Sequence, residues 1–104
     1  MIQESTINEI LDKIISGTNP DKIILFGSYG IGSPNENSDL DLLVVKDTDL
    51  PLHQRGREIR RLLLDSLVPI DILVYTKKEL EEVKDLKFSF LYDVLKTGKV
   101  VYER

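Results

Sequence analysis

Three short runs of apolar residues, each bounded by polar or turn-forming residues, set the pattern of this chain. They predict strands over Lys22–Phe26, Leu40–Val45 and Ile70–Tyr75. The run from residue 40 to residue 45 is apolar on both faces, as is usual for a strand that is covered on both sides. We therefore expect it to lie in the middle of a sheet.

Apolar residues at helical spacing precede, separate and follow these strands. We expect helices over Ser5–Ile15, Pro51–Leu67, Lys77–Lys84 and Asp85–Lys96, a turn that opens a short helix over Gly27–Gly32, and a short last strand over Val100–Tyr102. This order predicts a small α/β fold, with a mixed β-sheet flanked by helices. Residues 1–104 are expected to form a single domain.

The composition excludes several kinds of site. The chain of 104 residues has no cysteine and a single histidine, His53, which excludes thiolate chemistry and leaves little room for a histidine-based centre. A net charge of −4 argues against nucleic acid as the primary ligand, because phosphate backbones require a basic surface. No membrane span or signal peptide is evident in the sequence, so the cytoplasm is the expected location.

Two carboxylates mark the start of the predicted central strand. Asp39 and Asp41 are two residues apart, so their side chains share one face of the strand. Like charges this close favour a bound cation, and Mg²⁺ prefers carboxylate oxygens together with water and phosphate. The same spacing recurs at Asp47 and Asp49, but Leu50-Pro51 follows, and we interpret that pair as part of a loop.

Asp71 strengthens the metal-site hypothesis because it is a single acid within an otherwise apolar strand. An unpaired carboxylate there is costly to desolvate, so it requires a partner or a cleft at the strand end. Next to Asp39 and Asp41 it could share metal ions or accept a proton from an acceptor hydroxyl. The alternative is a strand-end aspartate that simply faces water.

Gly27 and Ser28 follow the first predicted strand directly. A glycine here allows close approach of a ligand to the backbone, and free N–H groups and a hydroxyl can hold phosphate oxygens. The segment is neither a P-loop nor a dinucleotide fingerprint. By itself Gly-Ser is a weak signal, compatible with an ordinary turn. Ten residues before Asp39-Leu40-Asp41, it predicts the binding of a nucleoside triphosphate and its magnesium.

The joined pattern resembles the nucleotidyltransferase superfamily that includes DNA polymerase β, and most of all its minimal nucleotidyltransferases. Gly27-Ser28, Asp39-Leu40-Asp41-Leu42 and Asp71 carry this resemblance, and residues 92–103 resemble the usual ending of these proteins. The resemblance implies the polymerase β-like fold. It also implies Mg²⁺ at Asp39, Asp41 and Asp71, and triphosphate binding at Gly27 and Ser28. One departure is Ile31, where family members often have Arg or Lys.

The resemblance also implies an activity and a partner. Minimal nucleotidyltransferases of this type act as antitoxins that transfer AMP from ATP to a tyrosine of a HEPN ribonuclease toxin. The predicted core leaves little chain for an acceptor pocket, which favours an acceptor brought by that partner. Two alternatives remain open: a binding module that inhibits its partner by occlusion, which Ile31 favours, and an enzyme that adenylylates a small molecule.

Other side chains are interpreted as structural. We expect the basic run at Arg55, Arg57, Arg60 and Arg61 to be a solvated helix face that pairs with Glu58 and Asp65, although one arginine could reach the triphosphate. The remaining candidates are expected at the surface (His53, Glu79, Glu81, Glu82), against the turn (Tyr29) or in the core (Phe88, Phe90, Tyr92). The alternatives are that Tyr29 stacks on a base or a partner, and that the three aromatic residues of the last helix extend an exposed patch for a partner.

Overall fold

The computed structural model describes residues 1–104, and its centre is a four-stranded sheet in the order β3-β2-β1-β4. The strands are β1 (Lys22–Phe26), β2 (Leu40–Val45), β3 (Ile70–Tyr75) and β4 (Lys99–Glu103). β2 is antiparallel to β1 and parallel to β3, and β4 is antiparallel to β1. The predicted mixed sheet and the interior position of β2 are confirmed.

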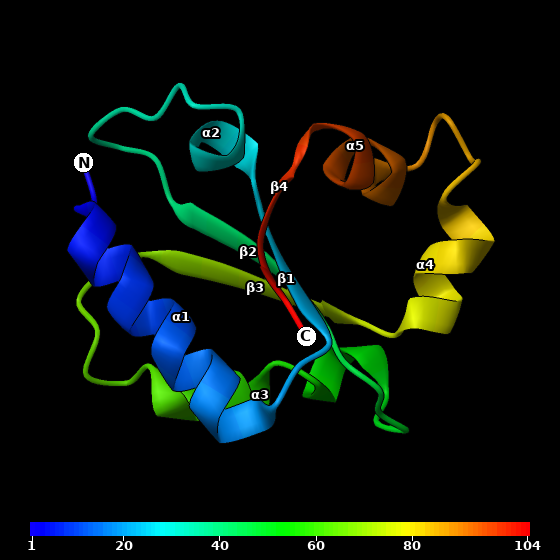
Figure 1. Ribbon diagram of the computed structural model, residues 1–104, viewed down its shortest axis with the longest axis horizontal. Helices are drawn as coiled ribbons and strands as arrows, with labels where there is room; N and C mark the ends of the chain where they lie inside the picture. The colour runs from blue at the N-terminus through cyan, green and yellow to red at the C-terminus, as the bar shows by residue number, and fades with distance from the viewer.

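Helices cover both faces of this sheet (Figure 1). α1 (Glu4–Thr18) and α3 (Arg57–Leu62) lie on one face, and α4 (Lys77–Val83) and α5 (Phe90–Thr97) lie on the other. The short α2 (Gly27–Gly30) follows β1, and a 3-10 turn, η1 (Leu52–Gln54), precedes α3. None of the helices has the length and apolar character needed to cross a membrane.

The alternation of side chains along β2 divides the core into two clusters. Leu40, Leu42 and Val44 are buried with residues of α1 and α3. Leu43 and Val45 are buried on the opposite face, with residues of α4 and α5. Asp41 has the parity of the second group, so the carboxylates of the central strand face the α5 side of the sheet.

The predicted helix over Pro51–Leu67 is wrong. The chain forms η1, then α3 begins at Arg57 and ends at Leu62. Arg55 and Gly56 form a turn between the two, and the buried Gly56 lies against the Arg60 guanidinium, which would be 2.5 Å from a Cβ at this position. Leu67, expected on the apolar face of this helix, is instead 99% exposed.

The predicted helix over Asp85–Lys96 is also wrong at its beginning. α5 begins at Phe90 because the Ser89 hydroxyl caps it, accepting a hydrogen bond of 3.0 Å from the Tyr92 amide. Phe88 therefore lies outside the helix and is fully exposed, and Phe90 is 62% exposed. The expected core positions of Phe88 and Phe90 are both wrong, since both side chains are mostly exposed.

Candidate active site

Three segments that are distant in the sequence meet at one end of the sheet. Phe26, the last residue of β1, pairs with Asp41, and Asp41 pairs with Asp71 across the parallel β2–β3 ladder. Neighbouring strands are about 4.8 Å apart, so the two aspartates are adjacent on one face. Gly27 follows Phe26 directly and completes the group. The structure thus brings together three of the five predicted site residues.

Gly27 is the one residue type that this position accepts. Its φ angle is +66°, in the left-handed region, and a Cβ built on it would overlap with Oδ2 of Asp41. The backbone after β1 therefore passes directly against the carboxylate of β2. This contact explains why the motif begins with glycine, and it leaves the surface beside Asp41 free of any side chain from this turn.

Asp41 is in an unfavourable setting for a negative charge. Burial raises its pKa first, and a hydrogen bond with Asp71 and the charges of Asp71 and Asp39 raise it further, to about 6. The two side chains that disfavour the charged form of Asp41, Asp71 and Asp39, are themselves acids. A cation placed among these oxygens would relieve that repulsion, so the donor chemistry fits a hard divalent ion.

Asp39 and Ser28 lie at the border of the site. Asp39 is exposed, one residue before β2, and Ser28 is half-buried within α2. Asp39 adds a negative charge that Asp41 senses, but no three acidic or histidine side chains converge closely enough to form a ready-made metal cage. The structure therefore supports a close Asp41–Asp71 pair with Asp39 beside it.

A cavity of about 690 Å³ opens over the pair. Its lining includes Gly27, Asp41 and Asp71, together with Arg60 from the basic run and three side chains that the sequence interpretation did not place here: Phe90, Asp93 and Thr97. Phe90 packs edge-to-face on Phe26, with ring centroids 5.9 Å apart, which holds α5 as one wall. The volume lies within the roughly 300–1,000 Å³ typical of small-molecule sites.

Among the four arginines of the basic run, two have roles that differ from the expected solvated face. Arg55 is largely buried and pairs with Glu79, with 2.6 Å between Nη1 and Oε1. Asp65 pairs with Lys13 at 2.8 Å, so its expected pairing with this run is wrong. Arg60 lines the active-site cavity and has no ion-pair partner in the chain. The Glu79 side chain is partly exposed, as expected of a solvated helix face, and also pairs with Arg55.

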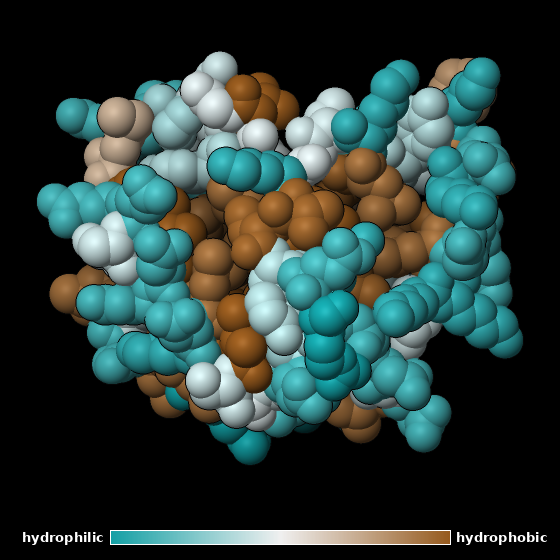
Figure 2. Space-filling view, in the orientation of Figure 1, coloured by the Kyte–Doolittle hydropathy of each residue, from teal (hydrophilic) through white to brown (hydrophobic).

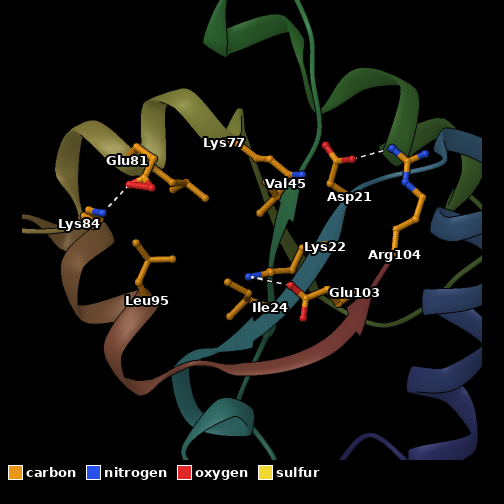
Figure 3. Close-up of a pocket in the computed structure, with 11 residues that line it drawn as sticks. Asp21, Lys22, Ile24, Val45, Lys77, Glu81, Lys84, Leu95, Glu103 and Arg104 are labelled. Atoms are coloured by element: carbon orange, nitrogen blue, oxygen red, sulfur yellow. Dashed lines mark hydrogen bonds and ion pairs between the residues drawn. The ribbon is translucent and has the colours of Figure 1, made fainter.

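A second cavity, of about 430 Å³, lies away from the acids, between α4, α5 and the β1–β4 edge (Figure 3). Apolar side chains such as Ile24 and Val45 form its floor, and Figure 2 shows apolar residues surrounded by hydrophilic ones on the face turned to the viewer. Its charged rim is mostly neutralised by ion pairs: Lys22–Glu103, Lys84–Glu81 and Arg104–Asp21. These contacts leave few free groups for catalysis.

The family follows from a match between this chain and a known domain. Residues 4–97 match the model of the nucleotidyltransferase domain, a span that includes every residue of the site described above. The chain belongs to the nucleotidyltransferase family. The resemblance expected from Gly27-Ser28, Asp39-Leu40-Asp41 and Asp71 is thereby confirmed.

Two relatives share enough sequence to support this assignment. Both are proteins of Methanocaldococcus jannaschii described as putative protein adenylyltransferases. One is 36% identical over 83 residues, which cover 78% of this chain and 77% of the relative. The other is 30% identical over 115 aligned positions, which cover 99% of this chain and 76% of the relative.

Solved structures confirm the fold of the nucleotidyltransferase. A putative nucleotidyltransferase from Sulfolobus solfataricus superposes with a TM-score of 0.68 at 19% identity, over 96% of this chain and 79% of that one. A toxin–antitoxin structure with AMP-PNP superposes with a TM-score of 0.57 at 22% identity, over 99% of this chain and 75% of that one. The predicted α/β nucleotidyltransferase fold is confirmed.

Proposed function

We propose that this nucleotidyltransferase transfers AMP from ATP to the hydroxyl group of a tyrosine on a partner HEPN toxin. By this modification it would act as the antitoxin. The observation that carries the proposal is the Asp41–Asp71 register pair beside the bare backbone of Gly27. The relatives described as protein adenylyltransferases and the toxin–antitoxin structure with AMP-PNP support the choice of substrate and partner. A cytoplasmic site of action is part of the proposal.

Each site residue has a role in this proposal. Asp39, Asp41 and Asp71 would hold Mg²⁺, and Gly27 and Ser28 would hold the triphosphate through backbone N–H groups and the hydroxyl. The metal, when bound, would orient the triphosphate and offset the negative charge that develops during transfer. The repulsion from Asp71 and Asp39 that helps to raise the pKa of Asp41 supports this assignment, because a bound cation would offset it.

The transfer itself is a substitution at phosphorus. The acceptor oxygen forms a bond to the α-phosphorus of ATP as the bond from that phosphorus to the β-phosphate oxygen breaks, and pyrophosphate leaves. The acceptor proton passes to the carboxylate of Asp71 or to water. Asp71 is suited to this role because it is exposed and lines the cavity, whereas Asp41 is half-buried.

Adenylylation would change the charge of the partner. An AMP group adds a bulky anion at the modified hydroxyl, and an anion near a ribonuclease site repels RNA phosphates. Transfer of AMP to such a toxin is therefore a physically reasonable way to neutralise it.

A second candidate function is inhibition by contact alone. Ile31 favours it, because this residue is 62% exposed and supplies no positive charge near the turn that would hold phosphate. In that case the carboxylates would have no catalytic role, and the chain would block its partner without nucleotide.

Label transfer from [α-³²P]ATP with Mg²⁺ separates the two functions. The chain is mixed with the product of the neighbouring gene, and Asp39→Ala is run in parallel with Asp47→Ala as the matched control. We expect a labelled partner with the unchanged chain and with Asp47→Ala, and no label with Asp39→Ala. Tight complex formation without label by all three proteins would contradict the enzymatic proposal and support inhibition by contact.

A further inference from the structure

The outer edge of β3 has unused backbone hydrogen-bonding groups. The carbonyls of Pro69 and Tyr75 accept hydrogen bonds from Leu40 and Lys46, on the β2 side. Because backbone groups alternate along a strand, the N–H and C=O groups of the even residues 70, 72 and 74 point away from β2. β3 is the last strand of the sheet at this side, so no further strand meets them.

Part of this edge is closed and part is open. The Arg55 guanidinium donates to the carbonyl of Val74 at 3.3 Å, which occupies the end of β3 nearest α4. No hydrogen bond outside the β2–β3 ladder involves Ile70 or Ile72. The open part therefore covers the first half of the strand, on both sides of Asp71.

This open edge lacks several of the features that usually prevent strand pairing, and Asp71 is its one charged residue. Exposed edges are commonly protected by lysine, proline or a bulge. β3 has no lysine or proline between residues 70 and 75 and pairs with β2 in continuous register. The opposite edge of the sheet, β4, begins with Lys99 and ends with Glu103, and its pairing with β1 is interrupted by an irregularity.

The open edge and the carboxylates belong to one cavity. The lining of the active-site cavity runs from Gly27 and Asp41 over Asp71 to the whole segment 70–73 and to Arg60 beyond it. Anything bound along the edge therefore lies directly beside the reacting centre. An extended polypeptide matches it best, because it presents complementary N–H and C=O groups at the strand spacing.

We propose that the acceptor of the transfer is an extended segment of the partner protein, which pairs with Ile70 and Ile72 as an added strand. This inference rests on the proposed function and specifies how its acceptor binds. The acceptor residue would lie on the Asp71 face of the sheet, and its two neighbours in sequence would face Arg60.

Strand spacing also selects the acceptor side chain. Strands lie about 4.8 Å apart, so an added strand is one spacing from Asp71 and two from Asp41. A tyrosine side chain is longer than one spacing and can bring its hydroxyl over Asp71 toward Asp41. A serine side chain is shorter than one spacing and its hydroxyl stays at the edge. The geometry therefore favours tyrosine over serine.

A tethered peptide tests this docking. The chain has no cysteine, so Leu67→Cys provides a single attachment point three residues before Ile70, at a position that is 99% exposed. A peptide with a central Thr-Val-Tyr-Val-Thr segment is joined to it through a flexible six-residue linker and a disulfide, which gives a millimolar effective concentration. Val100→Cys, on the β4 edge and 49% exposed, carries the same peptide as a control.

Two readouts separate docking from catalysis. With the tether at residue 67, we expect amide hydrogen exchange at Ile70 and Ile72 to slow by about tenfold or more, with Leu73 unchanged as internal control. We also expect labelling of the tethered tyrosine from [α-³²P]ATP and Mg²⁺, lost when serine replaces it. The control at residue 100 should show neither effect.

Each outcome has a distinct meaning. Slower exchange without labelling would uphold strand docking and contradict the proposed transfer. Labelling without slower exchange would uphold the transfer and overturn docking on β3. Absence of both from the tether at residue 67, or equal effects from residue 100, would also overturn the docking proposal.

Discussion

Each end of β2 has a pair of aspartates two residues apart, and the charges that surround the two pairs differ. Asp39 and Asp41 enter the strand beside a third carboxylate, Asp71. Asp47 and Asp49 follow the strand and line a polar cavity whose rim includes Lys46, Lys77, Lys78, Arg55 and Arg104. At the first end the carboxylates lie beside one another, and at the second end cations are interspersed with acids that include Asp21, Glu79 and Glu82.

Burial and pairing make the difference visible in the pKa values. Carboxylate neighbours and burial raise the pKa of Asp41 to about 6. Near the second end, the hydrogen-bonded Arg55 guanidinium lowers the pKa of Glu79 to about 2. An unlike charge beside a carboxylate favours its charged form, whereas neighbouring acids disfavour it. Spacing alone therefore does not distinguish the two pairs of acids; their surroundings in the sheet do.

The acid end of β2 should not tolerate a larger residue beside Asp41. Gly27→Ala places a methyl group against Oδ2 of Asp41 and forces an alanine into φ +66°. We expect label transfer to fall by more than about tenfold and the free energy of unfolding to fall by roughly 1–3 kcal/mol. Transfer rates and urea denaturation measure the two effects.

Gly32→Ala is the matched control for that substitution. Gly32 also has a positive φ, +80°, but a Cβ there would meet nothing within 4 Å. It should show the backbone cost alone, about 1 kcal/mol, with transfer retained. Equal losses of transfer in both variants would show that close contact with Asp41 is unimportant.

Much of the acid end could be predicted from the sequence because local periodicity determines it. Alternation along residues 40–45 places Asp41 on a known face, and an apolar strand around Asp71 makes a cleft partner necessary. The register that puts Asp71 directly beside Asp41 depends on a crossover of two dozen residues, so the sequence could predict the neighbourhood but not the pairing.

The walls of the site could not be predicted, because they depend on where helices begin and how they pack. Apolar spacing continues through Gly56, so the sequence predicted one long helix. The structure instead has the short α3, and Arg60 lies in it, one turn after Gly56. Likewise the Ser89 cap moves the start of α5 and turns Phe90 toward the cavity. The arginine run did contain a signal, since one member was a candidate for the triphosphate.

The cation-rich end should lose stability when its ion pair is neutralised. Glu79 accepts from Arg55 and from the Thr76 amide, in a capping box at the start of α4. Glu79→Gln should lower the free energy of unfolding at pH 7 by about 1 kcal/mol, because the pair is partly exposed. Urea denaturation gives this difference, and Glu82→Gln in the same cavity should match the unchanged chain.

The pH dependence of this difference has a definite sign. The folded pKa of Glu79, about 2, is below its ordinary value of 4.5, so its stabilisation is complete above pH 4.5 and lost as the pH falls toward 2. The gap between Glu79→Gln and the unchanged chain should therefore narrow from pH 5 to pH 3. A gap that is constant over this range would show that charge has no part in it.

Neutralising Asp41, at the acid end of β2, should have the opposite effect on stability: it should raise the free energy of unfolding at neutral pH. The folded pKa of Asp41, about 6, is above its ordinary value of 3.8, so its charge opposes folding above pH 6 and has no effect below pH 3.8. In EDTA, Asp41→Asn should raise the free energy of unfolding at pH 7 by on the order of 1 kcal/mol, since the group is partly exposed. The gain should vanish near pH 4, and Asp47→Asn should show none.

Magnesium provides the decisive arm of this last comparison. If the acids hold the ion, adding Mg²⁺ with a nonhydrolysable ATP analogue stabilises the unchanged chain by mass action and leaves Asp41→Asn where it was in EDTA. The difference in free energy of unfolding between the two proteins then becomes smaller or changes sign. Asp41→Asn that is less stable than the unchanged chain in EDTA at pH 7 would contradict the electrostatic account. An advantage that Mg²⁺ and the analogue leave untouched would contradict the metal site, because the repulsion at this end of β2 would then have no ligand to relieve it.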